Sequence, residues 1–433
     1  MIKYQMKKVI VRAVLSFWAL LTALILLEIL LRLFTPVPEN LAKLQSSTLF
    51  LHENKPNAVF PYSISDGVTV EIAINSDGFR DDQFTHDKAS DVYRIAVLGD
   101  SQEEALQVEL ADTWQKVMAR KLSRELAEKA SGPEGPFSES ETAPSQRPTR
   151  RVESYNFGVS GYGTDQQWLT LREKVWQFQP DMVILAFSPN DVGDTYKNKL
   201  VKVESGSPRF APASTIVAGE AGKLKVVDPK DRMGGNWLGK LVRETYIYHL
   251  VVKASLGNQF FKKLVDDVRI SILGFVKEER FFLSDAQLVQ GPFEVVASQK
   301  NPPREVLDSW SLIKVILADM KRQANEHKAV FLLTINIPKA QVQAGDWDHL
   351  QKTYKLDPNS SSAFEINEVL SEAAKDLEIN FYDPRLDGLE WKNQNGDLHF
   401  ALDAHYSKNG NLFMGTKVAE FILNNKLIDS LSN

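Results

Sequence analysis

The chain has no cysteine among its 433 residues, so disulfide bonds, a cysteine nucleophile and zinc–thiolate sites are excluded. It also lacks a basic stripe with interleaved aromatic residues, and its formal net charge is −5. Both observations argue against a nucleic-acid partner. Neither a phosphate-binding loop nor a metal-ligand spacing is present, and we therefore expect no cofactor and no metal ion.

The composition is otherwise typical of a globular protein, with 43% hydrophobic and 25% charged residues. The length has room for one large α/β domain with insertions, or for two modest domains.

One long hydrophobic run lies near the N-terminus, over residues 9–34. Its centre, residues 13–27, carries no charge, which is short of the roughly twenty residues that a membrane span needs. Arg12 can extend its charge toward the preceding lysines, however, and Glu28 and Arg32 form an i,i+4 pair at the far end. The run is apolar all round, which disfavours a buried helix of a soluble protein. We therefore predict a transmembrane helix over 9–34.

The charges around this run indicate its orientation. Three lysines precede it, and they favour a cytoplasmic tail over residues 1–8 with nearly all of the chain outside. No small-x-small cleavage site follows the run, so an uncleaved signal anchor is favoured over a removed signal peptide. The expected location is a bacterial inner (cell) membrane, single-pass, with the main domain facing the periplasm or exterior.

After the anchor, residues 35–90 are expected to form a stalk and N-terminal strands, the strands lying around a turn within 68–79. Residues 91–424 then alternate between strand and helix, which predicts a parallel, doubly wound α/β sheet. The expected strands are Ile95–Leu98, Val152–Phe157, Met182–Phe187, Ala329–Ile335 and Ile379–Tyr382. The expected helices are Thr113–Ala127, Gln166–Phe178, Arg304–His327, Ser362–Leu377 and Lys408–Asn424.

Two insertions interrupt this alternation. Residues 129–151 are rich in Gly, Pro, Ser, Glu and Thr and predict a flexible surface segment. Residues 200–303 hold Gly/Pro-rich loops and a helix predicted over Trp237–Leu256, and they could form a cap.

The sequence Gly99-Asp100-Ser101 directly follows the first predicted strand of this domain. A serine at the carboxyl end of a buried strand lies where open α/β sheets place their chemistry. The tripeptide alone is weak evidence, because a chain of this length contains one by chance about one time in ten. It gains weight only if the ends of the other strands carry the partners that a serine nucleophile needs.

Three further segments carry polar or glycine residues after a predicted strand or near the C-terminus. Gly158, Gly161 and Gly163 come after the second strand and could expose backbone N–H groups; of the three we favour Gly161. Asn190 comes after the third strand, where its side-chain amide could point over the sheet edge. Near the C-terminus, Asp403 and His405 are two residues apart in an extended loop and can face one cleft.

These residue types fit serine hydrolysis. His405 would take the proton of Ser101, and Asp403 would orient and stabilise the imidazolium. The oxyanion would be bound by the N–H groups of Ser101 and Gly161 and by the side chain of Asn190. Asp397 and His399 repeat the same spacing, but we prefer His405 because Ser407-x-x-Gly410 and an amphipathic helix come directly after it.

The ordered set of blocks resembles the SGNH (GDSL-type) hydrolase family, with Ser101, Gly161, Asn190 and His405 as its four marker residues. The segment Asn75-Ser-Asp-Gly-Phe-Arg80 and the anchor resemble the membrane-anchored bacterial branch of that family, which includes polysaccharide O-acetyl esterase and acetyltransferase proteins. The resemblance covers roughly 70–200 and 304–424. It implies a three-layer α/β/α flavodoxin-like fold and hydrolysis or transfer of acyl, above all acetyl, groups on a glycan or small ester through an acyl-serine intermediate.

The partners implied are an acylated carbohydrate or small ester, the membrane, and envelope polysaccharide-assembly proteins. Two alternatives remain. Ser188 stands where the family commonly has glycine, and Glu103 and Glu104 come soon after Ser101, which would suit a non-catalytic glycan-binding or envelope-assembly module. A lipase or thioesterase would share the chemistry and would need an apolar groove under the 200–303 insertion.

Overall fold

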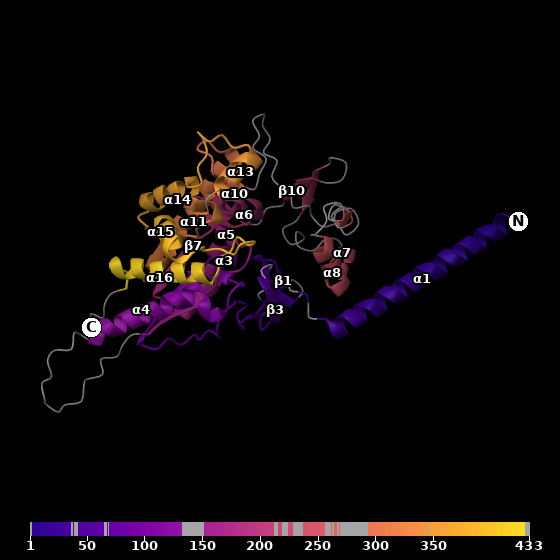
Figure 1. Cartoon of the computed structure of the whole chain (residues 1–433), viewed down its shortest axis with the longest axis horizontal. Helices are drawn as coiled ribbons and strands as arrows, with labels where there is room; N and C mark the ends of the chain where they lie inside the picture. The colour runs from indigo at the N-terminus through magenta and orange to yellow at the C-terminus, as the bar shows by residue number, and fades with distance from the viewer. Residues whose placement is uncertain are drawn as a thin grey trace, which may run out of the picture.

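The computed structural model shows a central α/β domain with a long helix, α1, projecting from it (Figure 1). It describes residues 2–35, 38, 42–64, 67, 69–131, 151–211, 215–218, 224–227, 237–255, 261, 264–265, 268, 293–343 and 345–428. The predicted flexible insertion 129–151 lies outside these residues except at its two ends.

The core of the domain is a parallel sheet, which has five strands in the described part of the chain. Its strand order is β13-β12-β7-β5-β6. Numbered along the chain, this is the order 2-1-3-4-5, the doubly wound arrangement of flavodoxin-like folds. The strands are β5 (Val92–Leu98), β6 (Arg151–Asn156), β7 (Met182–Phe187), β12 (Val330–Ile335) and β13 (Asn380–Tyr382). The predicted fold class and all five predicted strands are confirmed.

Helices cover both faces of the sheet, because its strands are apolar on both sides. In β7, Met182 and Ile184 pack toward one face, whereas Val183 and Leu185 pack toward the other. The helices α4 (Trp114–Ser131), α12 (Lys339–Val342), α15 (Arg385–Asn395) and α16 (Lys408–Asn424) contribute to the first face. The helical segments α5 (Thr164–Thr170), η2 (Leu171–Val175), η3 (Trp176–Phe178), α6 (Asp191–Asn198), α10 (Phe293–Val296), α11 (Arg304–Glu326) and α14 (Glu365–Asp376) contribute to the second.

The helices α4 and α16 lie side by side (Figure 1). Gly415 permits this close packing, since a Cβ there would lie 2.4 Å from the carbonyl oxygen of Trp114. The remaining helical segments of the domain are α3 (Ser101–Glu104), η1 (Leu110–Asp112) and α13 (Asp346–Tyr354).

The segment before the sheet is folded to a greater extent than predicted. It forms two antiparallel hairpins, from β1 (Leu44–Ser47) with β2 (Leu51–Asn54) and from β3 (Val59–Ser63) with β4 (Thr69–Ala73). The strand that pairs with β4 therefore comes before it in the chain. We had expected a strand on each side of the turn within 68–79, but no strand directly follows this turn. Residues 42–54, which we had assigned to a stalk, are part of the folded domain, because Phe50 and Leu51 lie in the main core.

The 200–303 insertion is described only in parts. The hairpin of β8 (Val201–Glu204) and β9 (Ser207–Phe210) packs against α11, and β10 (Thr215–Ala218) pairs with β11 (Leu224–Val227). The single helix predicted over 237–256 is instead two helices, α7 (Trp237–Arg243) and α8 (Tyr246–Ser255). Most of residues 256–292 lie outside the described residues.

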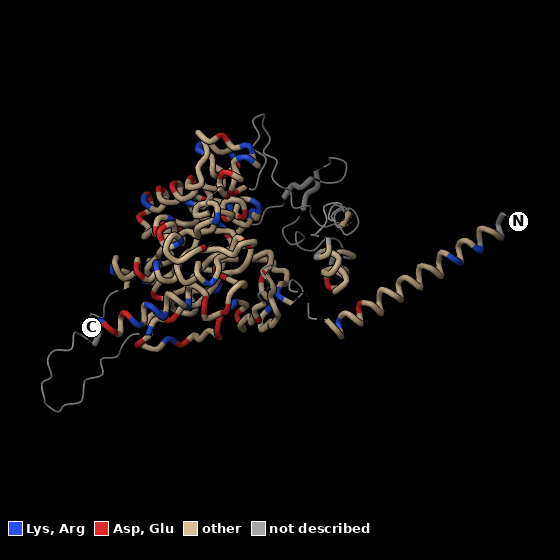
Figure 2. Tube along the Cα trace, viewed as in Figure 1, with Lys and Arg blue, Asp and Glu red and all other residues tan. Residues whose placement is uncertain are grey.

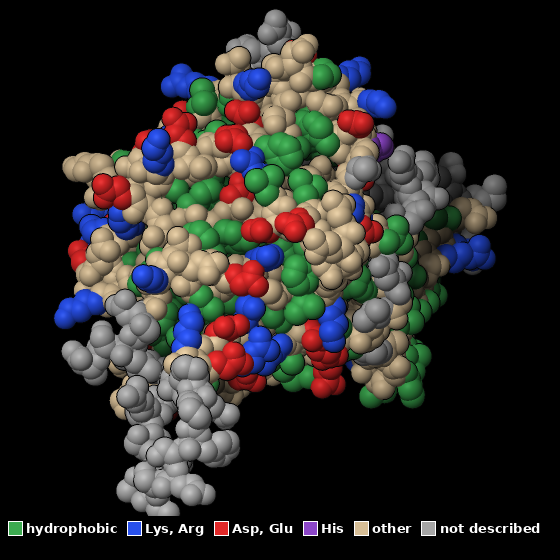
Figure 3. Space-filling view, turned by 60° about the vertical axis from the view of Figure 1, so that its left-hand side comes forward, with side chains coloured by type: hydrophobic (Ala, Val, Ile, Leu, Met, Phe, Trp, Pro, Cys, Tyr) green, Lys and Arg blue, Asp and Glu red, His purple; other side chains and the backbone are tan. Residues whose placement is uncertain are grey.

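The helix α1 spans Ile2–Phe34. Within the described residues it is the one helix long and apolar enough to cross a membrane, over Lys8–Phe34, and none of that stretch is buried. Its charged residues lie toward its two ends (Figure 2). On the domain itself, acidic and basic side chains are interspersed across the face seen in Figure 3.

Candidate active site

Ser101 is the first residue of the short helix α3, which begins directly after β5. Asp100 is the N-cap of this helix and accepts a hydrogen bond from the backbone N–H of Gln102 at 3.0 Å. The Glu103 carboxylate accepts from the Asp100 N–H at 3.0 Å and completes a capping box. Capping fixes the entry angle of the chain and holds Ser101 at the carboxyl edge of the sheet.

Ser101, His405 and Asp403 form a continuous chain of contacts. The Ser101 Oγ lies 2.8 Å from the His405 Nε2, and the His405 Nδ1 lies 2.5 Å from the Asp403 Oδ1. Asp403 also accepts from the His405 backbone N–H at 2.9 Å, which fixes the carboxylate relative to the ring. The hydrogen bond with the His405 side chain lowers the pKa of Asp403 below its usual value. A serine, an imidazole and an ionised carboxylate are thus placed in line.

The structure separates His405 from its competitor, His399. His399 is buried, its Nε2 lies 2.9 Å from the carbonyl oxygen of Ile337, and its ring stacks on Tyr406. Burial lowers the pKa of His399 to about 4. It is a neutral core residue in contact with neither Ser101 nor Asp403 in the described structure.

Of the three candidate loop glycines, Gly161 has the uncommitted backbone N–H. Gly158 donates to the Asn156 Oδ1 at 2.9 Å, and Gly163 donates to the Gln166 Oε1 at 3.1 Å. Among the described residues, no hydrogen bond is made by the N–H of Gly161 or of Ser101. Gly161 has φ +78°, a left-handed conformation that favours glycine.

The side chain of Asn190 contacts Asp100, the residue before Ser101, and its amide hydrogens are already bonded, which we had not expected. Its Nδ2 donates to the Asp100 Oδ2 at 2.9 Å and to the Asp194 Oδ2 at 3.0 Å. Both amide hydrogens therefore point to carboxylates. Asn190 can donate to an oxyanion only if one of these two hydrogen bonds breaks, most simply the bond to Asp194.

Ser188, which replaces the glycine common in the family, contributes to the same network. Its hydroxyl donates to the Asp100 Oδ1 at 2.9 Å and accepts from the Asn336 Nδ2 at 3.0 Å. The substitution thus gives the capping residue of α3 an additional donor.

Glu103 and Glu104 are both fully buried, and in the described structure neither carboxylate is hydrogen-bonded to Ser101, Asp403 or His405. Burial and the neighbouring charge of Asp100 raise the pKa of Glu103 to about 8. Burial also disfavours the charged form of Glu104, but the Lys43 ammonium and hydrogen bonds from Ser160 outweigh it and lower the pKa of Glu104. The acidic turn after Ser101 is therefore a structural support for the site.

Sequence reasoning missed the contribution of the β1–β2 hairpin. Lys43, which is 3% exposed, donates to the Glu104 carboxylate at 2.6 Å, and Asn54 donates to the same group at 2.9 Å. Glu104 in turn accepts from the backbone N–H of Ser160 at 2.9 Å and from its hydroxyl. The hairpin therefore holds the loop that carries Gly161, and nothing in the local sequence of 42–54 signals it.

His52 lies on the other side of the same loop. Its Nε2 lies 2.8 Å from the carbonyl oxygen of Ser160, and its ring packs edge-on against Tyr162. Burial lowers the pKa of His52, which favours the neutral ring at physiological pH.

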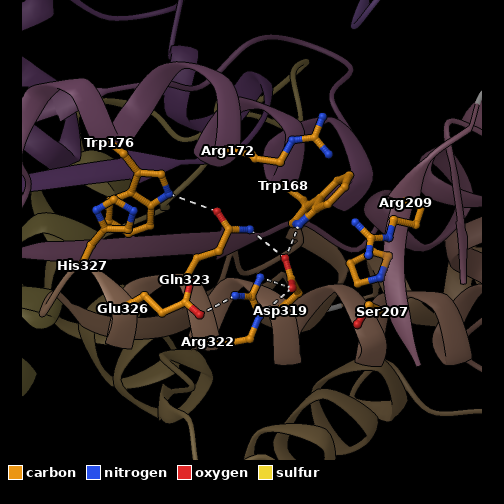
Figure 4. Close-up of a pocket in the computed structure, with 11 residues that line it drawn as sticks. Trp168, Arg172, Trp176, Ser207, Arg209, Asp319, Arg322, Gln323, Glu326 and His327 are labelled. Carbon is orange, nitrogen blue, oxygen red and sulfur yellow. Dashed lines mark hydrogen bonds and ion pairs between the residues drawn. The ribbon is translucent and has the colours of Figure 1, made fainter. Parts of the chain in front are cut away.

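A separate hollow of about 500 Å³ lies between α5, η2, η3, β9 and α11 (Figure 4). Its floor is a hydrogen-bonded set in which Asp319 accepts from Trp168, Arg322 and Gln323. None of the candidate catalytic residues lines it.

The structure combines three features: the strand order 2-1-3-4-5, a serine directly after the first strand of the sheet, and glycine, asparagine and histidine blocks that follow in that order along the chain. This combination resembles the SGNH hydrolase pattern that the sequence motifs suggested. No family model and no curated protein matches the sequence.

Several solved structures are similar to this chain over most of its length. One is a catalytic mutant of an acetylxylan esterase from Geobacillus stearothermophilus, with 12% identity, a TM-score of 0.36, and coverage of 81% of this chain and 100% of that one. Another is the psychrotrophic esterase EstA from Pseudoalteromonas sp., with 10% identity, a TM-score of 0.33, and coverage of 77% and 98%. A third is a putative lipolytic protein of the G-D-S-L family from Desulfitobacterium hafniense, with 10% identity, a TM-score of 0.32, and coverage of 76% and 98%.

Proposed function

We propose that this chain is an SGNH-type serine esterase that hydrolyses or transfers small acyl groups. The observation that carries the proposal is the Ser101–His405–Asp403 contact chain, with distances of 2.8 Å and 2.5 Å. Hydrogen-bond reach between nucleophile and base, with the base oriented by a third group, is the arrangement that activates a serine hydroxyl.

In the proposed reaction, the Ser101 Oγ attacks the ester carbonyl carbon while the His405 Nε2 takes its proton. Asp403 stabilises the imidazolium through Nδ1. The oxyanion accepts from the N–H groups of Ser101 and Gly161 and, once it is released from Asp194, from Asn190. The tetrahedral intermediate then collapses, and the alcohol leaves with the proton from His405. Water attacks the acyl-serine in hydrolysis, whereas a sugar hydroxyl attacks it in transfer.

A small acyl group, above all acetyl, is the favoured substrate. The residues next to Ser101 and Gly161 in the chain belong to a polar network, in which Asn190 donates to Asp100 and Asp194 and Ser160 donates to Glu104. Two buried or half-buried carboxylates near Asn190 also disfavour an anionic acyl group by charge repulsion. We propose an acetylated glycan or a small neutral ester, in line with the membrane-anchored branch that the sequence resembles.

We further propose that α1 anchors the enzyme in a bacterial inner membrane, with the SGNH domain on the periplasmic or outer side. Support comes from its length, its apolar surface, and the lysines before it. Envelope polysaccharide-assembly proteins would then be its neighbours.

The test compares wild type with Ser101→Ala and His405→Ala on p-nitrophenyl acetate and on acetylated glycans. Loss of at least about 10³-fold in kcat by both variants is expected, because triad members act as a unit. A fluorophosphonate probe should label wild type and not Ser101→Ala. Equal turnover by all three proteins would overturn the proposal.

A second candidate, a non-catalytic glycan-binding module, is favoured by one observation: both amide hydrogens of Asn190 are held by carboxylates. Glycan binding without fluorophosphonate labelling would support it. A lipase or thioesterase is distinguished by chain length, since it would prefer long acyl esters to p-nitrophenyl acetate.

A further inference from the structure

The end of α1 is bonded to the corner between α7 and α8. The Glu28 carboxylate accepts from the backbone N–H of Tyr246 at 3.0 Å and from that of Ile247 at 3.1 Å. These are the first residues of α8, so the carboxylate pairs with N–H groups that have no partner within the helix.

Arg32 strengthens the same junction. Its Nη2 donates to the carbonyl oxygen of Glu244 at 2.7 Å, and its guanidinium lies 5.2 Å from the centre of the Tyr246 ring. Arg32 is also paired with Glu28 at 2.8 Å. Two charged residues of α1 are therefore committed to a segment more than two hundred residues away in the chain, and Figure 1 shows α8 beside this end of α1.

The position of this junction along α1 determines where the junction lies relative to the bilayer. From Lys8 to Glu28 the helix rises about 30 Å, the thickness of the hydrocarbon core of a bilayer. With the lysines at the inner surface, Glu28 and Arg32 lie at the outer boundary, where charged groups remain hydrated. The α7–α8 corner is bonded to both residues and therefore lies at that boundary too.

Both helices of this corner expose apolar side chains. Leu250 is 55% exposed and Val251 37% exposed on α8, and Ala254 is also exposed one turn later on the same side. On α7, Leu241 is 62% exposed. Such a surface is costly in water but is stabilised at the headgroup–acyl boundary.

We infer that the α7–α8 corner is a second membrane contact, in which the exposed apolar side chains of both helices lie in the outer surface of the bilayer. This inference rests on the proposed anchoring by α1. Its consequence is that the SGNH domain is held at the membrane by two elements, α1 and the insertion, instead of moving freely on a single tether. The proposed substrate would accordingly be met close to the membrane surface.

The absence of cysteine allows a direct test with the full-length chain. Single cysteines at Leu20, Leu250 and Leu386 are labelled with the fluorophore NBD, and the protein is reconstituted in phosphatidylethanolamine–phosphatidylglycerol vesicles with or without doxyl-labelled lipid. Leu20 in α1 reports the anchor, Leu250 reports the corner, and Leu386, 73% exposed on α15, reports the water-facing domain.

We expect doxyl lipid to quench the labels at Leu20 and Leu250 several-fold more than the label at Leu386. Glu28→Ala should reduce quenching at Leu250 while leaving Leu20 unchanged, whereas the control Glu378→Ala should change neither. Quenching at Leu20 but not at Leu250 would overturn the inference and leave the anchor intact. A Leu250 label that is shielded from water yet unaffected by doxyl lipid would also overturn it, because a protein would then cover the corner. Turnover of p-nitrophenyl acetate by each labelled protein tests the proposed esterase activity independently.

Discussion

The side chain of Gln102 holds the backbone on both sides of His405. Its Nε2 donates to the carbonyl oxygen of Ala404 at 3.2 Å, and its Oε1 accepts from the N–H of Tyr406 at 3.1 Å. Gln102 is the residue directly after Ser101, so one side chain connects α3, which begins with Ser101, to the loop that carries His405. The two segments are about three hundred residues apart in the chain, and this contact sets how far His405 lies from Ser101.

Gln102→Ala should therefore lower kcat by about 10- to 100-fold with little change in KM, because a misplaced base costs rate more than binding. Gln102→Glu keeps the acceptor for Tyr406 but not the donor to Ala404, and we expect an intermediate rate. Steady-state kinetics on p-nitrophenyl acetate, with thermal unfolding as a check on folding, measure both. A KM increase without loss of kcat would contradict a role in positioning His405.

Asp194 provides a prediction of the opposite sign. Its carboxylate accepts an amide hydrogen of Asn190 that the proposed oxyanion would need. Asp194→Ala should raise kcat/KM for a neutral acetyl ester several-fold. Asp194→Asn removes the charge while keeping an oxygen acceptor, so comparison of the two variants separates charge from hydrogen bonding. A loss of activity in both would show that Asp194 positions Asn190 productively.

The Lys43–Glu104 pair predicts a large loss of stability on substitution. Lys43→Met leaves the Glu104 charge buried without its counter-ion, which costs about 3–5 kcal/mol in the free energy of unfolding. Lys43→Met combined with Glu104→Gln should recover part of this loss, because the uncompensated charge is removed. Urea unfolding of the single and double variants measures the difference. Equal stability of the two would argue against charge burial as the cause.

Asp165 predicts a specific pH dependence of stability. Burial raises the pKa of Asp165 to about 7, and its Oδ2 has no hydrogen-bond partner within the described structure. Between about pH 4 and 7 the folded protein retains a proton that the unfolded chain has lost, so Asp165 makes stability fall as pH rises through this window.

Asp165→Asn removes this titration and retains the Oδ1 acceptor for Asn198. Its stability relative to wild type should rise with pH by about 1.4 kcal/mol per unit between pH 4 and 7. Urea unfolding across this range tests the slope, with the exposed Asp376→Asn as control. Parallel stability curves for wild type and Asp165→Asn would contradict the prediction.

Much of the fold could be predicted from the sequence because its signals are local. Met182–Phe187 is a continuous apolar run that is typical of a central parallel strand, and Ser407 with the amphipathic pattern after it marks the start of α16 correctly. The N-terminal region was harder. The strands β1 and β2 are short and mixed in polarity. Lys43, directly before β1, contacts the distant Ser160 loop, and no local pattern predicts this contact.

The residues of the candidate site likewise include some that the sequence predicted and others that it did not. Ser101, Gly161, Asn190, Asp403 and His405 were predicted from residue types in order along the chain, since each comes after a recognisable strand or before a helix. Lys43, His52 and Gln102 were not identified as supports of the site, because a buried ion pair or a side-chain clamp has no local signature. Only the folded chain shows which distant group each of them meets.

The sequence by itself determined that Gly99-Asp100-Ser101 ends a buried strand and that a histidine and an aspartate two residues apart lie near the C-terminus. Hydrophobic periodicity and turn chemistry are properties of neighbouring residues, and they decide such elements. The tertiary structure alone decided that Glu103 and Glu104 turn inward and that Asn190 is held by Asp100 and Asp194. It also placed His405, which the sequence had favoured over His399, in contact with Ser101. Those outcomes depend on burial and on distances between segments far apart in the chain, which are fixed only when the layers pack.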